Sequence, residues 1–536
     1  MLNQTDLQKT FWKGTMIISG AALLVKVLSA FYRIPYQNIA GDLGLYVYQQ
    51  VYPFYAIAFA LSLYGFPLII SKVVSEHDER FVKDRLTTVF FGLSILFLLA
   101  FILLHQTAPM ISEAMNDPLL ITPLRMASYA FLFVPILSVA RGYFQGEKEM
   151  TPTAVSQVAE QSVRVTLILL LTIWFVGEGA DQYTVGSAAI FGGLVGSVVS
   201  IIVMLTYLRK NQTHPKVFQI PSISVMMHSF GLIWKVFKGG IAICITAVMF
   251  ALFSLVDALQ VVPGLHSGGL DLLEAKVNKG VFDRGQPLLQ LGTVLATSMA
   301  LPLIPFIAKS NHAQDKEKII TLTGQSLKFS FIIGGAAAVG LAVIIVPTNI
   351  FLYENTNGSM ALGILGAAIL FGSLAITSSA ILQGLGRIAY PVFFILIALM
   401  VKAALNAWLL PLYGITAAAV TTVISSAFVA CSNLFMIQRL TRVFHFQRFS
   451  GLKVLLALLL MAGITFVWKA FLLYFLPVED RLAAGLIALS SAVIGGVVYG
   501  FALIYQKVWK YEEMILLPKG KYLAKWFFRE RRDEDA

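Results

Sequence analysis

The sequence predicts an all-α polytopic membrane protein, and three observations lead to this prediction. Charged residues make up only 13% of the chain and hydrophobic residues 58%, a balance too apolar for a soluble core. The apolar residues fall into runs of about 20, which is the length of a helix that crosses a bilayer. Lys and Arg gather in alternate short loops, as they do when successive helices cross a membrane.

About fourteen apolar runs are long enough to cross the membrane. The loops between them are too short to hold a separate soluble domain, so any function is expected within the membrane body or on its faces. The predicted spans lie near 12–34, 50–73, 86–107, 121–143, 152–176, 184–207, 232–260, 286–308, 326–351, 361–384, 390–412, 415–438, 452–476 and 482–506.

The two halves of the chain resemble each other. Phe144-Gln145-Gly146 recurs as Leu382-Gln383-Gly384, and at the same offset Arg164 matches Lys402. Internal similarity of this kind predicts two pseudo-symmetric lobes of six helices each around a shared central cavity. The predicted parts are an N-lobe, a C-lobe, and two additional helices followed by a basic tail, at residues 1–228, 229–448 and 449–536.

The basic loops predict the orientation, because Lys and Arg in short loops stay on the cytoplasmic side. Loops of one set carry bases such as Lys316, whereas the other set carries acids such as Glu178 and Asp181; the loop 261–285 is an exception that also holds bases. Both termini are therefore expected in the cytoplasm. The net charge of +12 is explained by this bias and by the tail, and it favours anionic membrane lipid over nucleic acid as a partner.

Two bases lie deep within predicted spans. Arg164 and Lys402 are each about a dozen residues from either end, so reaching the headgroups would require a climb of roughly 15 Å. Glu160 stands one turn before Arg164, which leaves two interpretations open: a self-neutralised pair that ties helices together, or a ligand contact. Lys402 has no acid nearby on its own helix, and its polar companion is Asn406. It is therefore expected to face a hydrated cavity or a partner from elsewhere in the chain.

Other charges within the spans are mainly basic. Lys26 and Arg33 lie seven positions apart and so share one face of the first helix, and the matching span of the second half carries Asp257. Arg125 and Arg141 lie near span ends and are expected to reach the headgroups. An excess of deep bases predicts an anionic ligand, and phosphate is the anion that Arg and Lys recognise best.

The segment from Asn278 to Gln290 supplies a further pair of charges. Asp283 and Arg284 stand just outside the eighth predicted span. They could gate the outer mouth of a cavity or form an ordinary solvated loop pair, and the sequence leaves both readings open.

Several of these segments resemble a known family. Residues 140–146 (ARGYFQG), continuing through 150–157 (MTPTAVSQ), resemble the signature of Gram-positive polysaccharide exporters, as do Arg33-Ile34-Pro35-Tyr36 and Arg284-Gly285-Gln286-Pro287. These exporters belong to the multidrug/oligosaccharidyl-lipid/polysaccharide (MOP) flippase superfamily. Within it, the chain is most similar to the branch that contains MurJ and stage V sporulation protein B, and the resemblance covers nearly the whole chain.

The resemblance implies two six-helix lobes arranged as a V, with two additional helices that form a groove for a lipid tail. Members of this branch move undecaprenyl-diphosphate-linked sugars, such as the peptidoglycan precursor lipid II, between leaflets. They hold the diphosphate with bases on the first and eighth spans. Arg33 and Arg284 match those regions, whereas Lys26 stands where the family often has arginine, which keeps the charge but loses the bidentate fork.

The sequence thus predicts a monomeric lipid-linked saccharide flippase in the cell membrane of a Gram-positive bacterium. Alternating access, without covalent catalysis, metal or cofactor, is the expected mechanism; ion or membrane-potential coupling is left open. The predicted substrate-binding residues are Lys26, Arg33, Arg164, Arg284 and Lys402, supported by Glu160, Asp257, Asn406 and Gln290.

Two other functions are considered. A drug or cation antiporter of the same superfamily needs carboxylates deep in a lobe, whereas the deep charges here are mostly basic. A membrane glycosyltransferase or phosphatase needs an acidic metal site or a histidine motif, but the seven histidines are scattered. The identity of the saccharide is not encoded in any motif, since the diphosphate is common to many lipid-linked precursors.

Overall fold

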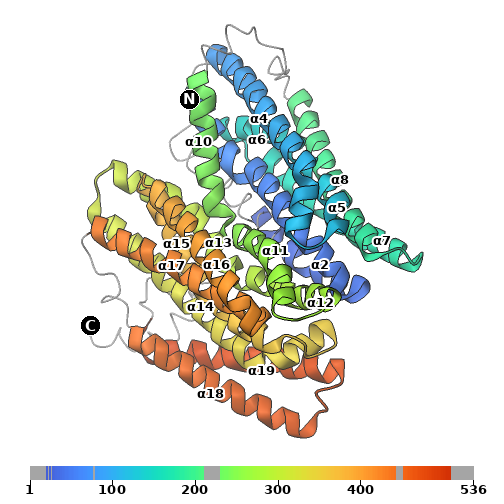
Figure 1. Ribbon diagram of the computed structural model, residues 1–536. Coiled ribbons are helices and arrows are strands. Elements are labelled where there is room, and N and C mark those ends of the chain that lie inside the picture. The colour runs from blue at the N-terminus through green and yellow to red at the C-terminus, as the bar shows by residue number, and fades with distance from the viewer. Residues whose placement is uncertain are drawn as a thin grey trace, which may run out of the picture. The chain divides into compact units, whose positions relative to one another are not determined.

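The computed structural model describes residues 20–21, 23–25, 27–76, 79–210, 230–441 and 451–508 (Figure 1). Within these ranges the regular structure is helical and contains no strand, which confirms the predicted fold class. Thirteen helices in the described chain are long and apolar enough to cross a membrane. Lys26, one of the predicted site residues, lies outside the described residues.

The chain divides into two compact units. The first unit comprises residues 1–294 and 386–429, and the second comprises residues 295–385 and 430–536. The predicted lobe boundaries at residues 228 and 448 are not tested by this division and stay a prediction. Two helices, α13 (Gly285–His312) and α17 (Ile415–Thr441), contribute residues to both units.

The first unit holds the N-terminal helices together with a second group from the middle of the chain. Helices α7 and α8 pack side by side along much of their length (Figure 1). Besides its parts of α13 and α17, this unit contains α2 (Arg33–Ala60), the π-helix η1 (Leu61–Gly65), α3 (Phe66–Ser75), α4 (Glu79–Ala114), the 3-10 helix η2 (Pro118–Leu120), α5 (Ile121–Ser128), α6 (Ala130–Gly146), α7 (Thr151–Gly177), α8 (Gln182–Lys210), α10 (Phe230–Ala247), α11 (Met249–Ser267), α12 (Leu272–Asp283) and α16 (Ala389–Tyr413).

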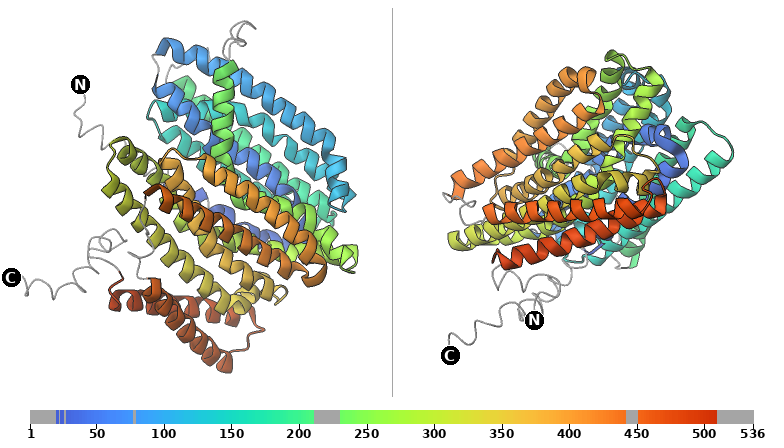
Figure 2. Two further views of the ribbon diagram at one scale, coloured as in Figure 1. Left: turned by 60° about the vertical axis from the view of Figure 1, so that its left-hand side comes forward. Right: turned by 90° about the horizontal axis from the view of Figure 1, so that it is seen from below.

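The second unit is built around one long helix. It contains α14 (Lys316–Tyr353), α15 (Ser359–Gly384), α18 (Gly451–Phe475) and α19 (Arg481–Tyr505), with the remaining parts of α13 and α17. Helices α18 and α19 pack together and against α14 (Figure 2). Their outer faces expose large apolar side chains such as Leu452, Val467 and Leu482. Exposed side chains of this kind suit contact with lipid tails.

The helices differ from the predicted spans in two places. The first two predicted spans form one helical run, Leu23–Ser75, which is bent where Gly41 adopts a φ of 72°. The seventh predicted span is interrupted at Val248, which separates α10 from α11. Hydropathy could not locate the break at Val248, because a backbone bend within an apolar run leaves the average hydropathy unchanged. Gly41 lies in the segment 35–49 between the first two predicted spans, where the expected loop is instead part of a bent helix.

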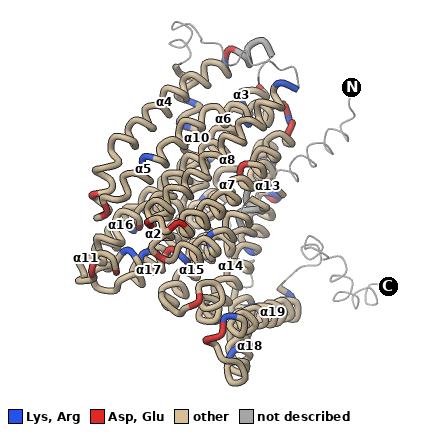
Figure 3. Tube along the Cα trace, turned by 90° about the vertical axis from the view of Figure 1, so that its right-hand side faces the viewer, with Lys and Arg blue, Asp and Glu red and all other residues tan. Residues whose placement is uncertain are grey.

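Charged residues are sparse along the helices, and most of the tube in Figure 3 has the colour of uncharged residues. The predicted loop 261–285 was the exception to the division into basic and acidic loops. It is mostly helical, because α11 extends to Ser267 and α12 follows. Its bases Lys276 and Lys279 are buried and bonded to the acids Asp117 (2.9 Å) and Asp283 (2.5 Å). This loop therefore contributes little net positive charge to its side of the protein.

Candidate functional site

The candidate site is a pair of buried guanidinium groups in the first unit. Arg33 begins α2 and Arg164 lies in the middle of α7, and their side chains are 4% and 2% exposed. Both guanidinium groups lie near the same ring, that of Tyr52, with their carbon atoms 4.5 Å and 5.5 Å from its centroid. The structure thus brings together two of the predicted substrate-binding residues from helices that are distant in sequence.

Neutral groups surround this guanidinium pair. Arg33 donates from Nη1 to the amide oxygen of Gln290 (2.8 Å), a contact that fits the predicted supporting role of Gln290. Arg164 donates from Nη2 to the hydroxyl oxygens of Tyr32 (3.4 Å) and Tyr48 (3.1 Å). Among the described residues, no carboxylate lies within ion-pair distance of either arginine, and the Nε of each is buried without a hydrogen-bond partner.

Aromatic residues of α2 form the wall against which the arginines pack. Tyr48, Tyr52, Tyr55 and Phe59 follow one another at helical spacing, with adjacent ring centroids 5.6, 6.4 and 6.3 Å apart. Arg164 lies over the ring of Tyr55 at 4.6 Å. Cation–π attraction stabilises a guanidinium here without cancelling its charge. No charge or motif in the sequence marks these tyrosines, although their spacing of three and four residues places them on one face of the helix.

Glu160 does not pair with Arg164, so the interpretation of a self-neutralised pair on α7 is wrong. Its carboxylate accepts from Arg141 (2.6 Å) and from the hydroxyl of Ser197 (2.9 Å). The expectation that Arg141 reaches the headgroups is also wrong, because its side chain is fully buried and also donates to Ser200 (2.7 Å). The physical reason is that the two side chains, although one turn apart, reach different neighbours: Glu160 bonds to residues of α6 and α8, and Arg164 bonds to Tyr48 on α2. Glu160 therefore stabilises the packing of the first unit.

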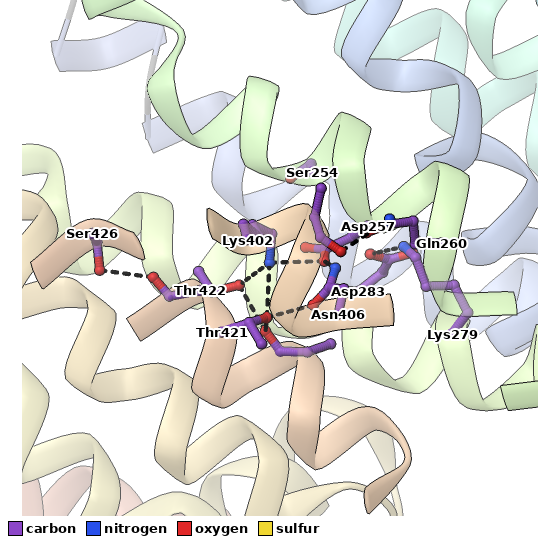
Figure 4. Close-up of polar contacts among 12 residues, drawn as sticks. Ser254, Asp257, Gln260, Lys279, Asp283, Lys402, Asn406, Thr421, Thr422 and Ser426 are labelled. Atoms are coloured by element: carbon purple, nitrogen blue, oxygen red, sulfur yellow. Dashed lines mark hydrogen bonds and ion pairs between the residues drawn. The ribbon is translucent and has the colours of Figure 1, made fainter. Parts of the chain in front are cut away.

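The charge of Lys402 is neutralised by a residue of another helix. This agrees with the expectation of a partner from elsewhere in the chain. The fully buried ammonium group of Lys402 lies 2.8 Å from the carboxylate of Asp257 on α11 and donates to Thr422 (2.7 Å) on α17 (Figure 4). Asn406 donates to the same carboxylate (3.0 Å) and accepts from Thr421 (2.6 Å). The predicted residues Lys402, Asp257 and Asn406 are thus brought together as a closed polar network that joins three helices.

Arg284 is buried and paired with an acid that lies 242 positions away in sequence. Its Nε and Nη2 donate to the two carboxylate oxygens of Asp42 at 2.8 Å and 2.5 Å, a bidentate arrangement. The reading of Asp283 and Arg284 as a solvated loop pair is wrong, because both are buried and Asp283 ends a helix. Burial raises the pKa of the Asp283 carboxyl to about 6, against the opposing attraction of Lys279.

Comparison with known proteins decides the family. The profile of the polysaccharide biosynthesis protein family matches residues 11–311, more than half of the chain. An uncharacterized membrane protein of Bacillus subtilis, YabM, is 37% identical over 98% of this chain and 98% of its own length. The chain belongs to the polysaccharide biosynthesis protein family. It is a multi-pass membrane protein of the MOP superfamily, as the resemblance of its motifs indicated.

Two further similarities concern MurJ within this superfamily. The lipid II flippase MurJ of Bacillus subtilis is 26% identical over 519 residues, which cover 91% of this chain and 94% of MurJ. A solved structure of the lipid II flippase MurJ in an inward closed conformation matches with a TM-score of 0.69 at 17% identity. The match covers 92% of this chain and 99% of the MurJ chain. The protein therefore has the MurJ fold.

Proposed function

We propose that this protein is a flippase that moves an undecaprenyl-diphosphate-linked saccharide across the cell membrane by alternating access. The observation that carries the proposal is the guanidinium pair of Arg33 and Arg164, which is buried with no acid within ion-pair distance among the described residues. Two desolvated positive charges at one place are costly unless an anion joins them. A diphosphate supplies both the charge and the acceptor oxygens that the two free Nε groups lack.

The charge balance favours an anionic substrate over a cationic one. Glu160 and Asp257, the acids that the sequence places deep in the spans, are bound to Arg141 and Lys402. A cation antiporter would need one of these carboxylates free to bind a proton, a sodium ion or a drug. The similarity to the lipid II flippase MurJ supports a diphosphate-linked saccharide, although peptidoglycan and other cell-wall precursors share this diphosphate.

The residues have separate roles in the proposed cycle. Arg33 and Arg164 bind the diphosphate, with the amide of Gln290 orienting Arg33. Arg284 is held by Asp42 in the present conformation and becomes available to the diphosphate only when that bidentate pair opens. The saccharide follows the diphosphate through the protein while the prenyl chain stays in the lipid, so that no covalent step is needed. Lys26 keeps its predicted assisting role.

Reconstitution tests this function. Purified protein in vesicles is expected to expose an undecaprenyl-diphosphate-linked fluorescent saccharide to an external quencher or glycosidase faster than protein-free vesicles do. A neutral prenyl glycoside without phosphate should not be moved, because it offers nothing to the guanidinium pair. Equal movement of both lipids, or of neither, would reject the proposal. Depletion in the host, followed by measurement of which lipid-linked precursor accumulates, identifies the natural saccharide.

The predicted orientation can be tested by thiol labelling. Asp181 is unsuitable for substitution because it caps α8, accepting from the backbone N–H of Tyr183 and Thr184, and the hydroxyl of Thr184 helps to hold its pKa below the usual value. A cysteine at the exposed Glu178 should react with an impermeant maleimide in intact cells, whereas one at Lys316 should react only after lysis. Both belong in a background lacking Cys244 and Cys431. Labelling of Lys316→Cys from outside intact cells would show that the predicted orientation is wrong.

A further inference from the structure

One face of α7 carries a row of buried polar atoms that have no hydrogen-bond partner. Thr153, Gln157, Gln161 and Arg164 are each at most 4% exposed. The unpaired atoms are Oγ1 of Thr153, Oε1 of Gln157, both amide atoms of Gln161 and Nε of Arg164. Buried polar groups are rarely left unsatisfied, because each unmade hydrogen bond has a large desolvation penalty. A row of them on one helix therefore suits a polar ligand.

The row is continuous with the guanidinium pair. At 100° per residue, Thr153, Gln157 and Arg164 fall within about 40° of one another around α7, and Gln161 lies beside them. From Thr153 to Arg164 the row is roughly 16 Å long at 1.5 Å per residue. The neighbouring Ser156 and Glu160, by contrast, are satisfied by Arg141. Glu160 lies only about 20° from Thr153 around α7, so the row and the ion-pair network share one side of the helix and differ in their hydrogen-bond partners.

The types of atom in the row specify the ligand. Carbonyl oxygens of Gln157 and Gln161 need hydrogen-bond donors, whereas the amide nitrogen of Gln161 and Nε of Arg164 need acceptors. An ionised diphosphate offers acceptors only, and a prenyl chain offers neither. A saccharide carries both in its hydroxyl and amide groups. We propose that Thr153, Gln157 and Gln161 form the subsite for the first sugars attached to the diphosphate. This inference rests on the proposed function, in which the arginine pair holds that diphosphate.

The aromatic wall on α2 borders the Arg164 end of this subsite. Tyr52 and Phe59 retain partly exposed rings, and Arg164 lies 5.5 Å and 5.9 Å from their centroids. A sugar ring has apolar C–H faces and polar hydroxyl edges, so it suits a site with aromatic rings beside amide groups. The row is long enough to contact more than one sugar ring. The subsite recognises hydroxyl-rich headgroups in general and selects against an unglycosylated lipid diphosphate.

Binding measurements with two lipids test the subsite. The probes are undecaprenyl diphosphate and an undecaprenyl-diphosphate-linked disaccharide, each titrated against the full-length protein in detergent. The double variant Gln157→Met, Gln161→Met keeps side-chain length but removes the amides. We expect roughly tenfold weaker binding of the disaccharide lipid, from the loss of two or three hydrogen bonds, and unchanged binding of undecaprenyl diphosphate. Ser162→Ala, on the exposed face of α7, is the matched control and should change neither.

Each outcome separates the subsite from the proposed function. Equal loss for both lipids would assign the glutamines to the diphosphate or to packing and would overturn the subsite. Unchanged affinity for both lipids would show that the row does not bind the saccharide and would also overturn the subsite. If the unmodified protein binds neither lipid, the proposed function itself fails. Thermal unfolding of the double variant at or above the temperature of the unmodified protein shows that lost binding is not lost folding, since the variant removes unsatisfied buried groups.

Discussion

Replacing both Arg33 and Arg164 by glutamine should abolish transport of the lipid-linked saccharide without lowering the stability of the protein. Each arginine can offer charge-assisted hydrogen bonds to a phosphate, of about 1.5–3 kcal/mol each, so one replacement should reduce transport tenfold or more. Stability should be unchanged or higher, because the two buried cations lack an acid partner in the described chain. The measurements are vesicle transport and thermal unfolding in detergent.

Two sets of variants sharpen this test. Arg33→Lys and Arg164→Lys should each retain part of the activity, because lysine keeps the charge but not the planar fork. Arg125→Gln is the matched control, since Arg125 is exposed on the short helix α5 and touches no part of the site. Full transport by the stably folded double variant would show that the diphosphate is held elsewhere, and Arg284 would be the next residue to replace. Loss of folding in that variant would contradict the inference that the two arginines do not stabilise the fold.

The fold was largely predictable because membrane helices are dictated by local composition. Apolar length and basic loops alone located most of the helices, and the motif around Arg141 indicated the superfamily. The break at Val248 and the π-helix at Leu61–Gly65 were not predictable, since both lie within apolar runs. Gly41 lies between two predicted spans, where a loop was expected and the structure has a bent helix. A bend depends on a few backbone dihedral angles, to which an average over about 20 residues is insensitive.

The candidate site was predictable as a set of charges but not as a set of pairs. Sequence spacing placed Glu160 within reach of Arg164, but both can also reach other helices, and Arg141 is the better-placed partner of Glu160. The partner of Arg284 is Asp42, which is 242 positions away and shares no motif with it. A pairing between distant helices depends on their tertiary packing, for which one sequence carries no direct signal.

Neutral residues of the site were not predictable from charge, because an uncharged side chain in a membrane helix gives no strong signal of function. Tyr48 and Tyr52 contact the arginines, and Gln161 has two unpaired amide atoms, yet none of them is costly enough in a membrane to attract notice. Their spacing was visible in the sequence. What distinguished them from ordinary packing residues was their position opposite or beside a buried guanidinium, which only the structure provides.

The ion pair of Lys402 and Asp257 should dominate the stability of the first unit, so Asp257→Ala is expected to be strongly destabilising. The variant leaves a fully buried ammonium group with only hydroxyl and amide neighbours, and breaking such a pair typically costs about 3–5 kcal/mol. The double variant Lys402→Met, Asp257→Leu should be markedly less destabilised, because no unpaired charge remains. Thermal unfolding in detergent of the single and double variants measures this difference.

A control for this cycle is the exposed pair of Lys72 on α3 and Glu76 just after that helix, where Glu76→Ala should change stability by less than about 1 kcal/mol. If Lys402→Met, Asp257→Leu is as unstable as Asp257→Ala, the network acts through Asn406 and Thr421 rather than through the charge pair. The cycle also tests the assignment of substrate contacts. Since Lys402 is already neutralised, a stable double variant should still transport, whereas loss of transport at full stability would return Lys402 to the substrate site.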